Sequence, residues 1–204
     1  VDGRTLIFFG GGDGVCYAFK PPKKAGGRDK PQILKKVWSC DCNPPDYRLR
    51  DGKPVPYRLG GDGPSEIIGT PVFHDGRVYV AIGQDPTHGD GKGGLTCIDA
   101  TGKGDITKTG KLWTNTQVRR SVSTPSVADG LVYIADISGR IHCLNAQTGT
   151  RHWVHETHSQ VWGSTLVADG KVYVNTQGGR LWVLPAGIIG TVTYFCSTFL
   201  GRPT

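Results

Sequence analysis

Three segments of the chain repeat one pattern, in which a short apolar stretch leads into an Asp-Gly pair and a second apolar stretch follows. β-Branched and aromatic residues alternate on both sides of each pair, and Asp-Gly readily adopts the positive φ angles of a tight hairpin turn. Each segment is therefore predicted to be a β-hairpin. The segments are 69–80, 123–134 and 163–174, with turns at Asp75-Gly76, Asp129-Gly130 and Asp169-Gly170.

Each hairpin is followed by two further predicted strands, so the repeating unit has four strands. Asp2-Gly3, at the start of the chain, indicates an additional copy of this unit that has lost its first strand. The last two Asp-Gly turns are 40 residues apart, which is the size of one propeller blade. The third strands are predicted at 15–19, 95–99, 141–145 and 181–184, and the fourth strands around Trp38, Trp113, Trp153 and Tyr194.

A four-stranded unit of this size cannot bury both of its faces alone, but units stacked around an axis cover one another. The predicted fold is therefore all-β, a β-propeller of four-stranded antiparallel blades. A parallel β-helix or a sandwich is the alternative, and sandwiches lack such regular self-similarity. We expect one domain over 1–204, with insertions at 21–34, 43–64, 84–94 and 102–110. The blades are expected at about 1–42, 67–118, 121–158 and 161–204.

The third unit contains Ala146-Gln147-Thr148-Gly149 and then Trp153, and the second keeps Ala100-Thr101-Gly102 before Trp113. This pattern resembles the tryptophan docking motif of pyrroloquinoline-quinone (PQQ) type propeller blades. The resemblance implies that Trp38, Trp113 and Trp153 are structural docking residues between adjacent blades. The stretches 42–45, 63–71 and 82–86 look like those of uncharacterised, exported bacterial PQQ-like repeat proteins of the planctomycete type.

PQQ-type propellers usually have seven or eight blades, and this chain supplies about four. The resemblance therefore implies a partial ring and a periplasmic or secreted location. No apolar run reaches the roughly 20 residues of a membrane-spanning helix. An open blade edge exposes unpaired backbone groups, so a protein partner or self-association through that edge is expected.

The loops that lead into the innermost strands usually carry function in propellers. Here they contain an acid, two guanidinium groups, an amide and an indole, which could grip an anionic or quinone-like ligand at the mouth of the channel. The alternative is that these loops only join one blade to the next by hydrogen bonds. The candidate ligand-binding residues are Glu66, Arg119, Arg120, Gln160 and Trp162, with Ser65 beside Glu66.

Asp85 and Asp90, in the glycine-rich insertion 85–94, are candidate ligands for Ca²⁺, although the spacing of an EF-hand loop is absent. A plain solvated loop is the alternative. His152, His155 and His158 come at spacings of three, which alternates the faces of a strand, so they are not expected to converge on a metal ion.

Five of the six cysteines divide into two groups, and the sixth, Cys196, falls at about the same repeat position as Cys40. Cys16, Cys97 and Cys143 are predicted at equivalent third-strand positions, as core packing residues. Cys40 and Cys42 share one strand face, where a metal or disulfide role competes with packing, and the sequence leaves their redox state open.

The net charge of +7 comes from scattered basic residues, and the one dense cluster lies within 20–36. Without aromatic or base-reading groups nearby, this indicates a solvated basic loop, not a site specific for nucleic acid. No catalytic triad, P-loop or dinucleotide motif appears. We expect a non-enzymatic binding or scaffold module for protein or polymer partners. The alternatives are a fragment of a PQQ-dependent dehydrogenase, with PQQ and Ca²⁺ as cofactors, and a structural subunit of a larger assembly.

Overall fold

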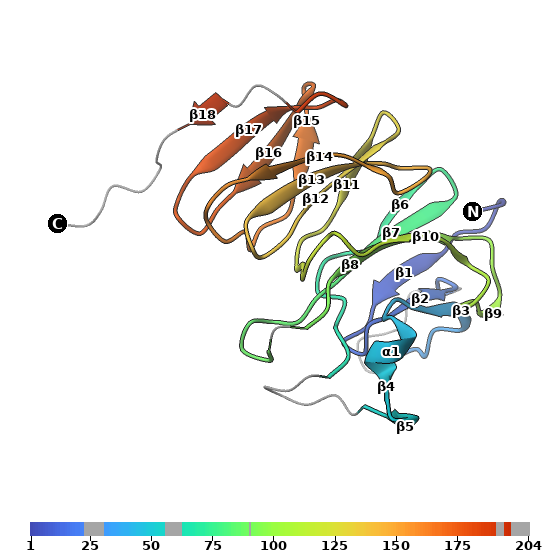
Figure 1. Cartoon of the computed structure of the whole chain (residues 1–204). Coiled ribbons are helices and arrows are strands. Elements are labelled where there is room, and N and C mark those ends of the chain that lie inside the picture. Colours follow the sequence, from blue (N-terminus) through green and yellow to red (C-terminus); the bar gives the residue numbers. More distant parts are fainter. Residues whose placement is uncertain (23–30, 56–62, 90, 191–193, 197–204) are drawn as a thin grey trace.

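The computed structural model describes residues 1–22, 31–55, 63–89, 91–190 and 194–196. These residues include four four-stranded sheets that stand side by side like the blades of a fan (Figure 1). The architecture confirms the all-β propeller fold. Asp90 and residues 23–30 of the basic cluster lie outside the described residues.

Three of the sheets contain the predicted four-stranded antiparallel unit, with the strands in chain order from one edge to the other. The second sheet contains β6 (Val72–His74), β7 (Arg77–Ile82), β8 (Gly94–Asp99) and β10 (Lys111–Asn115). The third contains β11 (Ser126–Ala128), β12 (Leu131–Ala135), β13 (Arg140–Asn145) and β14 (Arg151–Glu156). The fourth contains β15 (Leu166–Ala168), β16 (Lys171–Asn175), β17 (Leu181–Pro185) and β18 (Tyr194–Cys196).

The Asp-Gly pairs form the predicted turns between the first two strands of these sheets. In the third sheet Asp129 has a φ of 50° and Gly130 a φ of 73°, and the other two hairpins repeat these values within a few degrees. Asp2-Gly3 has the same geometry, and the Arg4 amide donates to the Val1 carbonyl at 2.7 Å. The hairpin turns were therefore predicted correctly, including the isolated one at the start of the chain.

The first sheet departs from the expected antiparallel unit. It contains β1 (Ile7–Gly10), β2 (Val15–Phe19) and β3 (Lys36–Asp41), and its fourth strand is β9 (Gly104–Asp105), which pairs with β3 in parallel. β9 lies in the 102–110 insertion of the following blade, which is long enough to reach back across the blade boundary.

Contacts on both sides of β9 hold this insertion in place. The Ile106 amide donates to the Ser39 carbonyl at 2.9 Å, and the Asp41 amide donates to the Thr107 hydroxyl at 3.0 Å. The Ile106 side chain is buried in the core between the first two sheets. The first unit thus has three strands of its own, as expected for a copy that has lost its first strand, but the parallel strand that the following blade adds to it was not predicted.

Each sheet packs on the next through a row of side chains that runs across its strands. In the second sheet the row is Tyr79, Cys97 and Trp113, and in the third it is Tyr133, Cys143 and Trp153. The tryptophan indoles reach the following blade. Nε1–H of Trp38 donates to the Ala100 carbonyl at 3.1 Å, that of Trp113 to Ala146 at 3.1 Å, and that of Trp153 to Gly187 at 2.8 Å.

Cys16 does not occupy the position predicted for it. Trp113 pairs with Cys97 and Trp153 with Cys143, but Trp38 pairs with Ala18. Ala18 is therefore the residue equivalent to the other two cysteines, and Cys16 lies two residues earlier on β2. Comparison of the repeats by sequence therefore placed Cys16 at a position that lies two residues from the true equivalent of Cys97 and Cys143.

The 43–64 insertion contains a short helix, α1 (Pro45–Arg48), and a two-stranded hairpin of β4 (Leu49–Arg50) and β5 (Lys53–Pro54). Arg48 anchors the helix to the first sheet with two hydrogen bonds to the Asp41 carboxylate, at 2.7 and 2.9 Å. The described residues contain no helix of the length and apolar character needed to cross a bilayer.

Candidate functional site

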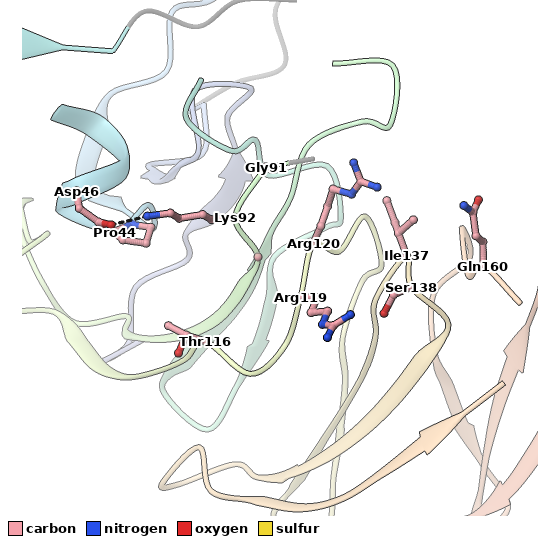
Figure 2. A pocket seen from close by; sticks show the side chains of 11 residues that line it. Pro44, Asp46, Gly91, Lys92, Thr116, Arg119, Arg120, Ile137, Ser138 and Gln160 are labelled. Carbon is pink, nitrogen blue, oxygen red and sulfur yellow. Dashed lines mark hydrogen bonds and ion pairs between the residues drawn. The ribbon is translucent and has the colours of Figure 1, made fainter. Parts of the chain in front are cut away.

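A cavity of about 730 Å³ opens at one end of the fan, where loops of successive blades meet. Its walls come from the start of α1, from the segment before β8, from the loop between β10 and β11, and from the β12–β13 turn (Figure 2). Propeller topology places all these loops at the same end of the sheets. The cavity therefore lies at the mouth that the sequence predicted to be functional.

Arg119 and Arg120 enter this cavity from the loop between β10 and β11. Arg119 is exposed, and Arg120 is half-buried with its guanidinium donating to the Gly89 carbonyl. The Arg120 carbonyl also accepts the Ile137 amide at 2.9 Å, which fixes this loop to the third blade. The loop backbone is thus tied to the third blade, and Arg119 presents its charge to the cavity.

Gln160 lies across the cavity from Asp46 and Lys92, in the loop that leads into the fourth sheet (Figure 2). Trp162 donates its indole N–H to the Gln160 side-chain carbonyl at 3.1 Å and is 44% exposed. Trp162 does not line the cavity itself, but it orients a side chain that does. The structure therefore brings Arg119, Arg120 and Gln160 together, with Trp162 behind Gln160.

Glu66 and Ser65 lie apart from this group. The Glu66 carboxylate is buried and contacts the His88 ring nitrogen Nδ1 at 2.9 Å. The Ser65 amide donates to the Asn43 side-chain carbonyl at 2.8 Å, and the Asn43 amide group donates to the Ser65 carbonyl at 2.9 Å. The Ser65–Asn43 contacts join the first blade to the loop that leads into the second, which is the structural alternative considered for these loops, whereas Glu66 contacts an insertion of the second blade.

Lys92 and Asp46 are lining residues that sequence reasoning missed. Lys92 forms an ion pair with Asp46 at the start of α1 (Figure 2). Its ammonium group also lies 5.3 Å from the centre of the Tyr47 ring. The hydrogen bond from Lys92 holds the pKa of Asp46 below its usual value. Both residues lie in insertions outside the repeat pattern, so no periodic signal marked them.

Ser138 lines the cavity at the edge of a buried polar cluster in the third blade. Its hydroxyl donates to the Asp136 carboxylate at 2.5 Å, and the other carboxylate oxygen lies 2.9 Å from Nε2 of the fully buried His142. Burial opposes ionisation of Asp136, but the hydrogen bonds from His142 and Ser138 outweigh it and lower the pKa of that carboxyl. The carboxylate stands between serine and imidazole, so His142 cannot take the serine proton as a general base.

The residues considered for metal binding do not converge. The Asp85 carboxylate accepts hydrogen bonds from the Thr87 amide and hydroxyl, at 2.8 and 2.5 Å. His152 and His155 lie on opposite faces of β14, as predicted, and His155 packs on Trp182 with ring centres 4.5 Å apart. Within the described part of the chain, no three His, Cys, Asp or Glu side chains are grouped to hold a metal ion.

The cavity lining does not fit a quinone cofactor with its calcium ion. Such a site needs flat aromatic or sulfur surfaces around the quinone and several carboxylate ligands for Ca²⁺. Among the described residues that line the cavity, none is aromatic, and the single carboxylate, Asp46, already pairs with Lys92. The exposed cationic group of Arg119 suits an anionic ligand instead.

Comparison with solved structures agrees with the fold. BamB from Moraxella catarrhalis superposes with a TM-score of 0.59 at 16% identity, over 94% of this chain and 47% of that one. A computationally designed protein, Ika8, gives 0.59 at 12% identity, over 93% and 46%. A europium-containing methanol dehydrogenase gives 0.47 at 19% identity, over 68% and 27%. The chain thus spans about half the length, or less, of these structures.

The fold and its repeats define a PQQ-like repeat β-propeller. Within that class, residues 92–188 match the family described as outer membrane protein assembly factor BamB. No curated protein matches the chain.

Proposed function

We propose that this propeller is a non-enzymatic binding module that holds an acidic segment of a protein partner in the cavity beside Arg119. The observation that carries the proposal is the exposed guanidinium of Arg119 in a cavity walled by several successive blades. A planar guanidinium donates two parallel hydrogen bonds to a carboxylate, which gives both charge and geometric complementarity.

The neighbouring polar groups support an extended ligand. Gln160, Ser138 and Thr116 also line the cavity and offer an amide and two hydroxyls to a peptide backbone. A cavity of about 730 Å³ has room for a few side chains of a bound segment. The BamB-like family is named for assembly of outer membrane proteins, which supports a protein partner and a location outside the cytoplasm.

The test is binding of a fluorescent peptide rich in Glu and Asp, measured by fluorescence anisotropy. Arg119→Ala should weaken binding about tenfold or more, because a hydrogen-bonded ion pair contributes about 1.5–3 kcal/mol. Arg151→Ala is the matched control, since Arg151 lies on the outer strand β14 away from the cavity. Binding of the parent chain should also weaken as salt is raised.

Two results would contradict the proposal. One is equal binding by the Arg119→Ala and Arg151→Ala variants, which would mean that the basic surface attracts the peptide without a site. The other is dye reduction by the chain after addition of PQQ and Ca²⁺, which would favour the dehydrogenase alternative.

A second role, as a structural subunit completed at its open faces, is supported by the last sheet. Leu166, Tyr173 and Val183 are register partners on that sheet, in the positions that Ser126, Tyr133 and Cys143 occupy in the third sheet. In the second and third sheets the next blade covers that row, whereas Leu166 is 59% exposed. We propose that another blade covers this row, in a ring of seven or eight.

A further inference from the structure

Ser138 lines the cavity with a hydroxyl group whose hydrogen is already engaged. The hydroxyl donates to Oδ1 of the Asp136 carboxylate at 2.5 Å. Ser138 itself is exposed, whereas Asp136 is fully buried. A serine hydroxyl has one hydrogen and two lone pairs, so only the lone pairs remain for a ligand. Ser138 therefore presents a hydrogen-bond acceptor to the cavity.

Both oxygens of the Asp136 carboxylate are held in place. Oδ1 also accepts the Arg140 amide at 3.2 Å, and Oδ2 lies 2.9 Å from Nε2 of the buried His142. Burial raises the pKa of Asp136, but the hydrogen bonds from His142 and Ser138 lower it more, so the carboxyl is ionised. An ionised carboxylate accepts hydrogen bonds and donates none. The direction of the bond from Ser138 to Asp136 is therefore fixed.

The turn that carries these polar side chains does not require them. The fourth blade closes the equivalent turn with the same backbone hydrogen bond, from an amide to the carbonyl four residues further on, at 2.9 Å in both blades. The counterparts in the fourth blade are Thr176 for Asp136, Gly178 for Ser138 and Trp182 for His142. The fourth blade thus forms this turn without the carboxylate, the serine hydroxyl or the imidazole, so a role in the fold alone does not account for them.

The cavity wall places this acceptor beside a donor. The Ile137 amide donates to the Arg120 carbonyl at 2.9 Å, so the turn with Ser138 and the loop with Arg119 run side by side at the wall (Figure 2). A guanidinium group can only donate hydrogen bonds. A ligand that contacts both side chains therefore needs an acceptor for Arg119 and a donor for Ser138. In an acidic peptide, a side-chain carboxylate is the acceptor and a backbone N–H is the donor.

We propose that Ser138 is a specificity-determining residue of this cavity, which accepts a backbone N–H of the bound segment next to the carboxylate that Arg119 binds. The proposal rests on the proposed function, and it narrows the ligand to an acidic residue with a free backbone amide beside it. A second ligand carboxylate at Ser138 would meet lone pairs and be rejected. A proline beside the acidic residue would lack the donor. Asp136 is a positioning residue, because it acts on the ligand only through Ser138.

The test is a backbone scan of the fluorescent acidic peptide, measured by fluorescence anisotropy. Each amide in turn is replaced by an ester, which removes one N–H with little change in shape. At one position beside an acidic residue, the ester should weaken binding to the parent chain about three- to tenfold, the range expected for one hydrogen bond. At that position the ester should weaken binding to Ser138→Ala by less than about twofold, because the acceptor is gone. Asp136→Asn should shrink the ester effect and leave the loss caused by Arg119→Ala in place.

Thr101→Ala is the matched control. The Thr101 hydroxyl donates to the Asp99 carboxylate at 2.7 Å, two residues back as in the Ser138 contact, but Thr101 does not line the cavity. That variant should keep the full ester effect, and so should Ser138→Thr, which retains a hydroxyl. The proposal is overturned, and the proposed function stands, if every ester effect survives in Ser138→Ala while Arg119→Ala still weakens binding. If the peptide does not bind, or binds without dependence on Arg119, both are overturned.

Discussion

At the scale of single residues, Trp38 shows what joins neighbouring blades. Its side chain is fully buried, and its N–H is satisfied by the carbonyl of Ala100 in the next blade. A buried carbonyl that loses such a donor carries its desolvation cost without compensation. The family resemblance implies a docking role for this tryptophan. That role can therefore be measured as the loss in free energy of unfolding when the indole is replaced.

Trp38→Phe should lower the free energy of unfolding by about 2–4 kcal/mol, from the lost hydrogen bond and the smaller ring. Trp162→Phe makes the same chemical change on a half-exposed indole, and should cost under about 0.5 kcal/mol. Urea unfolding followed by circular dichroism measures both. Equal losses in the two variants would contradict a docking role.

The sequence could predict some site residues because propeller topology is regular. Arg119, Arg120 and Gln160 follow from their places in the loops before the innermost strands, and the cavity brings them together. Glu66 has the same kind of position, but its partner His88 lies in an insertion, so its burial was not predictable. Contacts made by residues in insertions cannot be predicted from the repeat, because the insertions do not recur from blade to blade.

At the scale of elements, the Asp-Gly hairpin is the part of the fold that the sequence determines most directly. Gly130 has a φ of 73°, and a Cβ atom there would meet nothing within 4 Å. Any loss of stability caused by a side chain at this position therefore comes from backbone strain and not from a clash with neighbouring atoms. The strands around such turns were predicted at nearly their observed bounds, for example 141–145 against β13 (Arg140–Asn145).

Gly130→Ala should destabilise the chain by about 1–2 kcal/mol, because an L-residue with a side chain is strained in the left-handed region. Gly163→Ala is the control. Gly163 also has open space around it but no positive φ, so that variant should be neutral or slightly stabilising. Thermal unfolding monitored by circular dichroism compares the two. A Gly130→Ala variant as stable as the control would show that this turn is not strained by a side chain.

At the scale of the whole molecule, the four blades bury three seams and leave two faces open. One open face carries the Leu166 row of the last sheet, and at the other end β1 has Phe9 58% exposed. Exposed apolar rows of this kind mark interaction surfaces. The number of blades in the complete ring stays a prediction, because internal repetition defines the unit and not how often it occurs.

Leu166→Ser should reduce self-association of the chain, because it places a polar group in the row that another blade would cover. Light scattering coupled to gel filtration, over a range of protein concentrations, gives the oligomeric mass. Leu112→Ser is the control, since Leu112 is exposed on the outer strand β10 and not on an end face. A chain that stays monomeric at every concentration would argue against completion by a second copy.

The reach of β9 onto β3 has a consequence for how this protein can be divided. Repeat boundaries drawn from the sequence would divide the chain near residue 67. The outermost strand of the first sheet, β9, comes from residues after that boundary. A fragment ending there would expose the backbone edge of β3, and its complement would carry a strand with nothing to pair with. The first two repeats are thus one indivisible piece, and any dissection of this protein into modules has to begin after the second.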